Sequence, residues 1–323
     1  MRGLIRTGIG LGILGSAAIA ALAAWPIGRP VALGMMTGDP TRGAYLARSS
    51  GCVTCHTNIA DAGPALAGGA PLDTPFGSFV PPNITSDLVA GIGGWTLDQF
   101  AVAVRQGIRP DGKAYYPAFP YEFYAGFTDQ EVADLWAAIR TVPAVDQAAA
   151  PHDVGFPFNL RWGLKIWRAA YMAPVEMSPL LGKSDAWNRG QQLAQGATHC
   201  AACHTGRNIL GGLQADEAFG GNDNLPGGSA APAIGAAVLR DAGWTPANLA
   251  YALRTGIMPD GDVLGGSMAE VVKDGTSFLT DDDRTAIAAF LLDSADGSQP
   301  PGDNAVAVPR DAPMDDMSGM VMD

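Results

Sequence analysis

The chain is poor in basic residues and has no long stretch of alternating apolar residues. It carries 20 Lys and Arg against 32 Asp and Glu, a formal net charge of −12 at pH 7. Without a basic patch to follow phosphates, nucleic acid is not an expected partner. Without an alternating apolar run, an extended sheet is not expected either. The acidic surface favours a docking partner with a basic face, or it only keeps the protein soluble.

Cysteine and histidine are scarce, with four of each in 323 residues. Two motifs of the form Cys-x-x-Cys-His use all the cysteines and half of the histidines: Cys52, Cys55, His56, Cys200, Cys203 and His204. In this attachment motif for c-type haem, the thiols add to the haem vinyl groups and the histidine becomes an axial iron ligand. A four-cysteine zinc site that pools both pairs is the alternative, but it leaves both adjacent histidines unexplained. The repeated motif therefore predicts two covalently bound haem c groups.

The repeat extends beyond the cysteines. The pattern Gly-Trp-Thr to Arg-x-Gly-Ile-x-Pro-Asp-Gly occupies residues 94–112 and returns without a gap at residues 243–261. Arg-Gly-x-x-Leu-Ala precedes both motifs, starting at Arg42 and at Arg189. A repeat of this length predicts two copies of one small domain rather than a solenoid.

Each copy has the pattern of amphipathic helices. Residues 42–50 and 96–106 place apolar side chains at helical spacing, and Thr96 is a good N-cap. Thr128 opens a capping box, and Thr280 opens the equivalent helix in the second copy. We therefore expect an all-α protein in which a few helices surround a large apolar cofactor.

Several further motifs between residues 38 and 295 are typical of one family. They are Arg-Gly-x-Tyr-Leu at 42–46, Pro-Phe-Gly at 75–77, Asn-Ile-Thr at 83–85, Gly-Ile-Gly-Gly-Trp at 91–95 and Phe-Pro-Phe-Asn-Leu-Arg-Trp at 156–162. With these residues the chain resembles dihaem cytochromes c that form the cytochrome subunit of membrane-bound alcohol and related periplasmic dehydrogenases. The resemblance implies two tandem class I cytochrome c domains, residues 38–147 and 184–295, that carry electrons between redox protein partners.

The resemblance also implies the remaining iron ligands. Met268 lies where the family places its thioether ligand, opposite His204, and His/Met ligation raises the reduction potential. The matching residue of the first copy is Phe119, which has no lone pair to donate. We therefore expect the first haem to be five-coordinate or to recruit another donor, either His152 or Met172, although His152 would also be an ordinary solvated loop residue.

The residues around the two haem histidines differ between the copies. Gly63-Pro64 resembles the class I segment whose proline carbonyl accepts the second N–H of the ligand histidine. The second copy lacks this proline, and its Arg207 and Asn208 are candidates for contacts with haem propionates or with solvent. His199, directly before Cys200, is expected at the surface or near a propionate.

The N-terminus predicts the compartment. Residues 7–28 contain no charged residue and follow Arg2 and Arg6. As a helix they would span roughly 33 Å at about 1.5 Å per residue, enough for the hydrocarbon core of a bilayer. We expect residues 1–30 to form a single-pass transmembrane helix in the inner (cytoplasmic) membrane, with both haem domains in the periplasm. The alternative is a cleaved signal peptide, because residues 21–23 have the Ala-x-Ala form.

Two segments lie outside the repeat. Residues 148–183 hold many large apolar side chains: Phe156, Phe158, Trp162, Trp167, Tyr171 and Met172. We expect this linker to pack between the domains and fix the haem-to-haem distance, or to present a partner or membrane-facing surface. Residues 296–323 predict a flexible tail with four soft candidate ligands for Cu(I): Met314, Met317, Met320 and Met322.

Three classes of function fit these observations. The first is a membrane-anchored electron carrier between a periplasmic dehydrogenase or bc1-type complex and a terminal oxidase or other acceptor. The second is an enzyme, for example a peroxidase, which would need an open site at the first haem. The third is a subunit that anchors and wires a respiratory complex. An electron-transfer protein or subunit is favoured over a stand-alone enzyme, because electron transfer needs no catalytic side chain.

Overall fold

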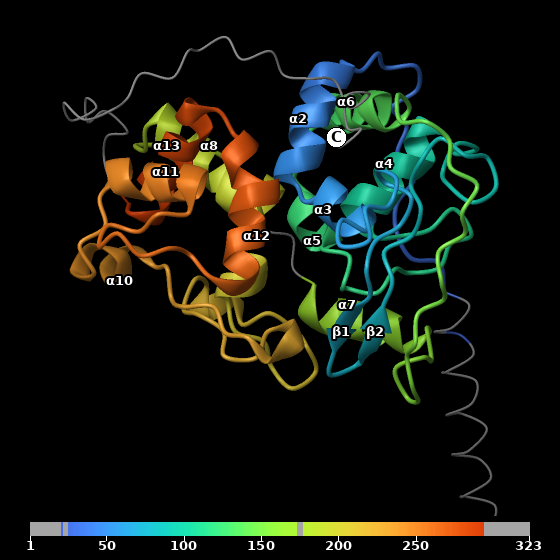
Figure 1. The fold of residues 1–323 in the computed structure, drawn as a ribbon. Helices are drawn as coiled ribbons and strands as arrows, with labels where there is room; N and C mark the ends of the chain where they lie inside the picture. The colour runs from blue at the N-terminus through green and yellow to red at the C-terminus, as the bar shows by residue number, and fades with distance from the viewer. Residues whose placement is uncertain (1–20, 22–24, 173–176, 294–323) are drawn as a thin grey trace, which may run out of the picture.

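A computed structural model describes residues 21, 25–172 and 177–293, and it forms two helical lobes side by side (Figure 1). The first lobe contains α2 (Pro40–Ser49), α3 (Cys52–His56), β1 (Leu72–Thr74), β2 (Gly77–Phe79), α4 (Leu97–Gln106), α5 (Tyr121–Tyr124) and α6 (Asp129–Ile139). The second lobe contains α8 (Asp185–Gln192), the π-helix η1 (Leu193–Ala197), α9 (Ala201–His204), α10 (Ala236–Asp241), α11 (Pro246–Thr255), α12 (Gly266–Asp274) and α13 (Asp281–Leu291). Three 3₁₀ turns also belong to it: η2 (Ala215–Glu217), η3 (Pro226–Gly228) and η4 (Thr276–Phe278). The segment between the lobes contains α7 (Gly163–Tyr171).

A glycine sets the crossing of the first and last helices in each lobe. A Cβ on Gly43 of α2 would lie 1.8 Å from the carbonyl oxygen of Asp134 in α6. A Cβ on Gly190 of α8 would lie 1.9 Å from the carbonyl oxygen of Ala286 in α13. Only glycine permits such a close approach, which explains why the repeated Arg-Gly pair stands where it does.

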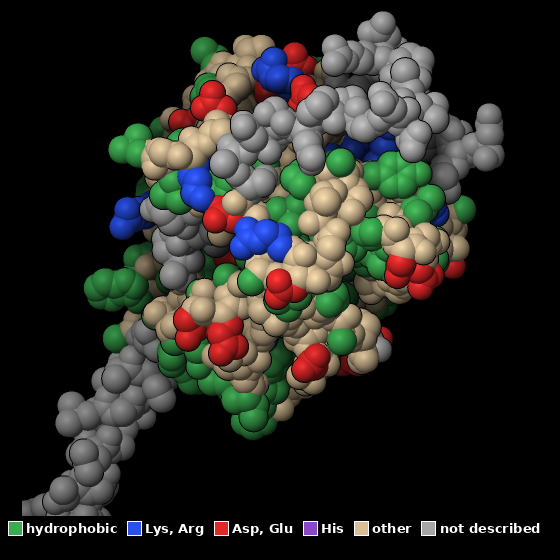
Figure 2. Space-filling view, turned by 90° about the vertical axis from the view of Figure 1, so that its left-hand side faces the viewer, with side chains coloured by type: hydrophobic (Ala, Val, Ile, Leu, Met, Phe, Trp, Pro, Cys, Tyr) green, Lys and Arg blue, Asp and Glu red, His purple; other side chains and the backbone are tan. Residues whose placement is uncertain are grey.

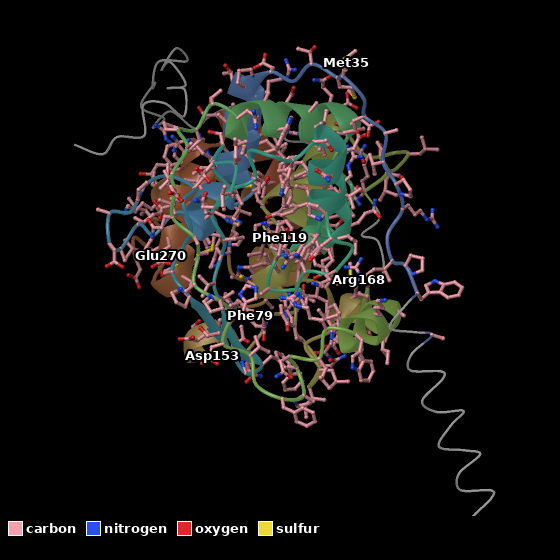
Figure 3. The ribbon with its side chains drawn as sticks, turned by 90° about the vertical axis from the view of Figure 1, so that its right-hand side faces the viewer. Met35, Phe79, Phe119, Asp153, Arg168 and Glu270 are labelled. Atoms are coloured by element: carbon pink, nitrogen blue, oxygen red, sulfur yellow. The ribbon has the colours of Figure 1, made fainter. Side chains whose placement is uncertain are left out.

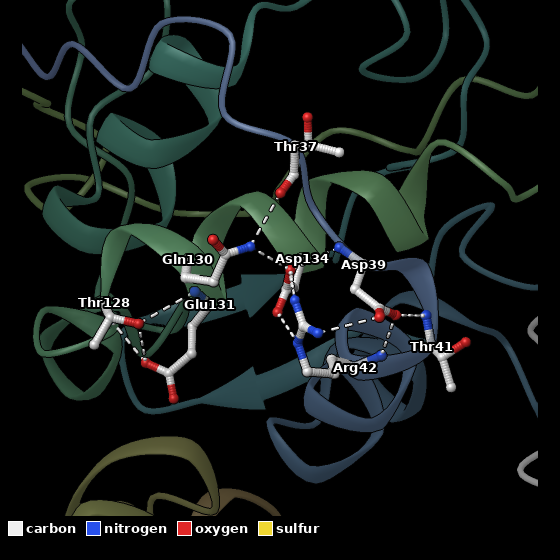
Figure 4. A network of polar contacts seen from close by, with 8 residues as sticks. All are labelled: Thr37, Asp39, Thr41, Arg42, Thr128, Gln130, Glu131 and Asp134. Atoms are coloured by element: carbon white, nitrogen blue, oxygen red, sulfur yellow. Dashed lines mark hydrogen bonds and ion pairs between the residues drawn. The ribbon is translucent and has the colours of Figure 1, made fainter.

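An arginine and an aspartate reinforce each crossing, as Figure 4 shows for the first lobe. Arg42 donates from Nε and Nη2 to the two oxygens of Asp134, at 2.7 and 3.0 Å. Asp134 also accepts from the backbone N–H of Asp39 and from Gln130. Burial opposes ionisation, but these hydrogen bonds outweigh it and hold the pKa of Asp134 below its usual value.

The predicted threonine N-caps are confirmed, whereas the helix expected over residues 42–50 begins earlier, at Pro40, after the N-cap Asp39. Thr96 and Thr128 both form complete capping boxes, with Gln99 and Glu131 as the reciprocal residues. Thr280 caps α13 through the backbone N–H of Asp283, but no reciprocal box forms there. The Asp283 carboxylate is bonded elsewhere, to Arg189 at 2.9 Å through both Nε and Nη2.

The expectation of an all-α protein needs a correction. β1 and β2 form a short antiparallel hairpin, with Leu72 paired to Phe79. Its turn depends on Gly77, which has a φ of +129°, and on the Thr74 hydroxyl, which donates to the Gly77 carbonyl. Strands of three residues are too short to produce a visible alternating pattern, so they could not be predicted from the sequence.

Two sequence predictions lie largely outside the described residues. Of the expected anchor, residues 1–30, the structure describes only residue 21 and residues 25–30, and the tail at residues 296–323 is not described. Among the helices that are described, none is long and apolar enough to cross a membrane. The Cu(I) prediction for the tail methionines remains a prediction.

Candidate haem-attachment sites

Both cysteine motifs lie on single helical turns. In the first lobe, Gly51 in the left-handed conformation begins α3, and its carbonyl accepts from the N–H of Cys55 at 2.9 Å. In the second lobe, the carbonyl of Cys200 accepts from the N–H of His204 at 2.9 Å. Residues three apart in a helical turn lie on the same side, so each turn presents two thiols together with the histidine that follows.

No disulfide joins the four thiols. All four cysteines are free, and burial raises the pKa of every thiol. Within the described parts of the chain, no three His, Cys, Asp or Glu side chains are grouped as metal ligands. Each pair is therefore left with its own histidine, which is the donor set that haem c uses.

A proline carbonyl holds each motif histidine. His56 Nδ1 lies 2.7 Å from the carbonyl oxygen of Pro82, and His204 Nδ1 lies 2.7 Å from that of Pro232. A carbonyl only accepts, so Nδ1 carries the proton and the lone pair of Nε2 is available to an iron atom. Burial lowers the pKa of both histidines, which favours this neutral form. The residues present fit haem c in both lobes.

This geometry corrects the prediction for the proline. The partner of His56 is Pro82 and not Pro64, and the second lobe does have an equivalent in Pro232. The sequence contained a signal, because Pro-x-Ile occurs at both places and ends at Ile84 and Ile234. The repeat was missed because these prolines lie 26 and 28 residues after their histidines, much farther along the chain than Pro64 does.

The loop behind each histidine is built in the same way. The hydroxyls of Thr57 and Thr205, directly after the motifs, accept from the N–H groups of Leu66 and Phe219 at 3.1 Å. Leu66 and Phe219 have φ values of 57° and 62°, uncommon for residues other than glycine. The same constrained turn in both lobes aims the proline segment at the histidine.

Met268 and Phe119 occupy comparable places in the two lobes. Met268 lies in the first turn of α12 and is half-buried, and Phe119 is also half-buried. Both pack against the hydrophobic cluster that Cys52 and Cys200 also contact. Figure 3 shows Phe119 near the middle of the molecule, and its ring lies 6.0 Å from that of Tyr124. The assignment of Met268 as an iron ligand stays a prediction.

His152 is not arranged to replace the missing thioether. Its Nδ1 accepts from the backbone N–H of Val80 at 3.1 Å, so Nε2 carries the proton. Neither nitrogen then has a lone pair free for iron. The ring also packs edge-on against Phe79 and Tyr116. Burial and the nearby charge of Arg161 lower the pKa of His152, which keeps the imidazole neutral.

Met172 remains the other candidate donor. It ends α7, is half-buried, and donates its N–H to the carbonyl of Arg168. The next residues, 173–176, are outside the described part of the chain.

His199 is half-buried between the lobes. Its ring is near those of Phe123 and Tyr124 in the first lobe, at centroid distances of 6.0 and 5.8 Å. A Cβ on Gly51 would lie only 3.5 Å from His199 Cε1. His199 directly precedes Cys200 and Gly51 directly precedes Cys52, so the two attachment turns meet at this contact.

Arg207 and Asn208 shape their own loop. Arg207 donates to the carbonyl of Gly211 at 2.9 Å, and Asn208 Oδ1 accepts from the N–H groups of Leu210 and Gly212. Burial lowers the pKa of Arg207, while the nearby Glu122 of the first lobe opposes that shift. A propionate contact by either residue stays a prediction.

Tyr45 of α2 makes a second contact between the lobes. Its hydroxyl donates to Asp283 at 2.6 Å and accepts from the N–H of Thr280 at 3.2 Å. Burial, helped by the bond to Asp283, raises the pKa of Tyr45 to about 12. The guanidinium of Arg48 also lies 4.5 Å above the ring of Phe278. Sequence analysis did not find the contact between the lobes made by Tyr45 or the hydrogen bond from Tyr124 to Ser50. It also did not find the two carbonyls that hold the motif histidines, those of Pro82 and Pro232.

Comparison with known proteins identifies relatives along most of the chain. The cytochrome c family model matches residues 187–295. A diheme cytochrome c-type protein of Cereibacter sphaeroides is 40% identical over 264 residues, which cover 79% of this chain and 86% of that protein. The gluconate 2-dehydrogenase cytochrome c subunit of Pantoea cypripedii is 38% identical, over 80% of this chain and 60% of that subunit. The fructose dehydrogenase cytochrome subunit of Gluconobacter japonicus is 39% identical, over 78% and 51%. The chain thus spans about half to three-fifths of these two dehydrogenase subunits.

Proposed function

Because this chain belongs to the dihaem cytochrome c family, we propose that it carries electrons between a periplasmic dehydrogenase or bc1-type complex and a terminal oxidase or other acceptor. Two covalently bound haem c groups supply the one-electron chemistry. Cys52 and Cys55 with His56 hold the first, and the second motif holds the other with Met268. We assign the two domains to residues 38–147 and 184–295.

The contact between the attachment turns is the observation that carries this proposal. His199 reaches the backbone at Gly51, and Tyr124 Oη donates to the carbonyl of Ser50 at 2.5 Å. Gly51 and His199 directly precede the first cysteine of their motifs and Ser50 lies two positions before Cys52, while Tyr124 of α5 holds the first turn from within its own lobe. Electron tunnelling weakens steeply with distance, so cofactors joined at adjoining turns exchange electrons within the molecule. Two haems that acted independently of each other would not require their attachment turns to be in contact.

We also propose that residues 1–30 anchor the chain in the inner membrane with both lobes in the periplasm. The uncharged stretch at residues 7–28 supports the anchor, and the haem motifs support the compartment. The names of the relatives, which include cytochrome subunits of gluconate and fructose dehydrogenases, support a dehydrogenase as the electron donor.

Capture of a tagged chain from native membranes tests the proposal. We expect a dehydrogenase or an oxidoreductase complex to co-purify, and its substrate to reduce the c-type absorbance of the captured material. A stoichiometric complex would indicate a subunit, and weak capture with rapid reduction would indicate a mobile carrier. The matched control is a chain with all four cysteines replaced by alanine. Absence of reduction by any co-purified donor, in protein that contains haem, would contradict electron transfer.

Phe119 supports a second candidate, an enzyme that uses an open first haem. Its ring cannot ligate iron, and His152 has its lone pair occupied by Val80. Carbon monoxide binding to one haem of the reduced protein would favour this reading. A protein in which neither haem binds carbon monoxide would be an electron carrier only.

A further inference from the structure

A group of apolar side chains is exposed around α7. We define the α7 face as Trp25, Phe156, Phe158, Ile166, Ile209 and Leu210. Phe156 and Ile209 are 81% and 92% exposed, and Ile166 is 49% exposed. Figure 2 shows hydrophobic side chains gathered at the lower end of the molecule, the end where Figure 1 places α7, β1 and β2. A group of exposed large apolar side chains is typical of a surface that contacts a protein, a membrane or a ligand.

The contacts beneath these side chains make the face continuous across the linker and both lobes. Phe158 packs edge-on against Phe76 of the hairpin at 5.0 Å. Phe76 in turn lies beside Gly211 of the second lobe, where a Cβ would be 3.0 Å from its ring. Trp167 of α7 donates to the carbonyl of Leu210 at 2.7 Å. The face is therefore held in one shape by the folded protein.

The charge of the linker differs from that of the whole chain. Residues 154–172 contain Arg161, Lys165 and Arg168 and no acidic residue, although the chain as a whole has a formal net charge of −12. A helix with aromatic and aliphatic groups beside basic groups suits the boundary between lipid headgroups and acyl chains. These three side chains are half-buried and donate to the backbone carbonyls of Ala114, Trp25 and Gln106, so they act through the local positive field and not as free headgroup ligands. Anionic headgroups complement that positive charge.

The N-terminal segment meets the protein at this same face. The carbonyl of Trp25 accepts from Lys165 Nζ at 2.6 Å, and Ile27 packs on the cluster that contains Leu164. Arg29 then exchanges two hydrogen bonds with the side chain of Gln106. Residues 25–29, where the uncharged stretch ends, therefore lie directly beside α7.

From these observations we propose that the α7 face rests on the surface of a lipid bilayer that contains anionic lipids. Its apolar side chains enter the headgroup boundary, and the positive charge of the half-buried Arg161, Lys165 and Arg168 behind them attracts anionic lipids. The inference rests in part on the proposed membrane anchor. It adds an orientation, because two attachments, the N-terminal segment and the α7 face, fix how both lobes stand on the membrane.

Single added cysteines test the face. The native cysteines are consumed by haem attachment, so Phe156→Cys or Ile166→Cys in the full haem-loaded chain accepts an environment-sensitive fluorophore at one site. The matched control is Leu181→Cys, at a fully exposed leucine beside α8 in the second lobe. We expect blue-shifted emission at 156 and 166 with vesicles of phosphatidylcholine and phosphatidylglycerol, and quenching by nitroxide-labelled lipids. The label at 181 should show neither effect.

Flotation of the same vesicles separates the two proposals. Protein that floats while the labels at 156 and 166 stay unchanged would overturn the α7 face and leave the anchor intact. Protein that does not float with either anionic or neutral vesicles would overturn both. A blue shift that occurs only when a purified dehydrogenase is added would identify the face as a protein interface and overturn the lipid proposal. Haem content and reduction by substrate are read separately, so failure of electron transfer is distinguishable from all three outcomes.

Discussion

Phe119 stands in the first lobe where Met268 stands in the second, and both pack on one hydrophobic cluster. Around Phe119 the structure places tyrosines rather than ligands, with ring centroids at 5.6 Å for Tyr115 and 5.9 Å for Tyr121. We therefore expect this single difference to separate the electronic properties of two otherwise repeated sites. We expect the second haem, with its thioether, to have the higher reduction potential and to collect electrons.

We predict that Phe119→Met gives the first haem the ligand it lacks. The variant should gain a second Met-to-iron charge-transfer band in the near infrared and raise the lower of the two potentials. Phe119→Leu is the control, because it changes the volume without providing a lone pair. A wild-type spectrum in which both haems already show the band would contradict the prediction.

The second residue-scale prediction concerns acidity. Burial opposes ionisation of Asp283, but the hydrogen bonds from Arg189 and Tyr45 outweigh it and lower its pKa. The folded state then binds fewer protons than the unfolded state, so this contribution to stability is present above the ordinary pKa of about 3.9 and is lost as the pH falls through the folded value. Tyr45→Phe should lower the free energy of unfolding by about 1–2 kcal/mol at pH 7.

The difference between Tyr45→Phe and the wild type should shrink as the pH falls from 7 toward 3, because acid favours the protonated form of Asp283, which no longer accepts a charge-assisted hydrogen bond. Thermal unfolding of the haem-loaded protein at both pH values measures it. Tyr251→Phe, at an exposed tyrosine of α11, is the control and should unfold like the wild type. An equal difference at pH 7 and pH 3 would mean that Tyr45 does not act through the carboxylate.

At the scale of helices, the two crossings depend on Gly43 and Gly190. We predict that Gly43→Ala or Gly190→Ala costs about 3 kcal/mol or more, because the added methyl meets a backbone carbonyl that cannot move without displacing a helix. Gly163→Ala in the first turn of α7 is the matched control, since nothing lies within 4 Å of its Cβ position. Chemical denaturation of the three variants gives the comparison, and a neutral Gly190→Ala would show that α8 and α13 can separate at no cost.

The helices that sequence analysis predicted correctly are those whose ends are determined by residues close together in the chain. Thr96 and Thr128 begin helices because their side chains bond to backbone groups three residues away. The contact between His56 and Pro82 joins residues that are far apart in the chain, and the same holds for His204 and Pro232. Pro64 was predicted wrongly because it lies close to His56 in the sequence. In the folded protein, the carbonyl that reaches the His56 ring is that of Pro82.

At the scale of the whole molecule, the functional groups of the two motifs were predictable, but their mutual position was not. His199 was expected at the surface or near a propionate, and only the packing of Phe123 and Tyr124 against it shows that the attachment turns adjoin. No periodicity in the sequence reports how one domain docks on another. The repeat predicted two domains, and the structure adds that one continuous cluster of buried residues runs through both.

We predict two covalently bound haems per chain, each removable on its own. Cys52→Ala with Cys55→Ala should leave one haem with the Met-type near-infrared band, and Cys200→Ala with Cys203→Ala should leave one haem without it. Pyridine haemochrome analysis and near-infrared spectra of the two double variants test the count and the assignment together. Zinc in the purified protein, or the band in the second variant only, would overturn this assignment.

The hydrophobic cluster shared by the two lobes can be completed only after the second lobe has been synthesised. The first lobe leaves the ribosome with Tyr45 and the Phe123–Tyr124 surface still uncovered, because their partners Asp283 and His199 are synthesised later. A nascent chain is therefore held for a time with an apolar side open to solvent. We expect a chain truncated between the lobes to expose this surface and to aggregate.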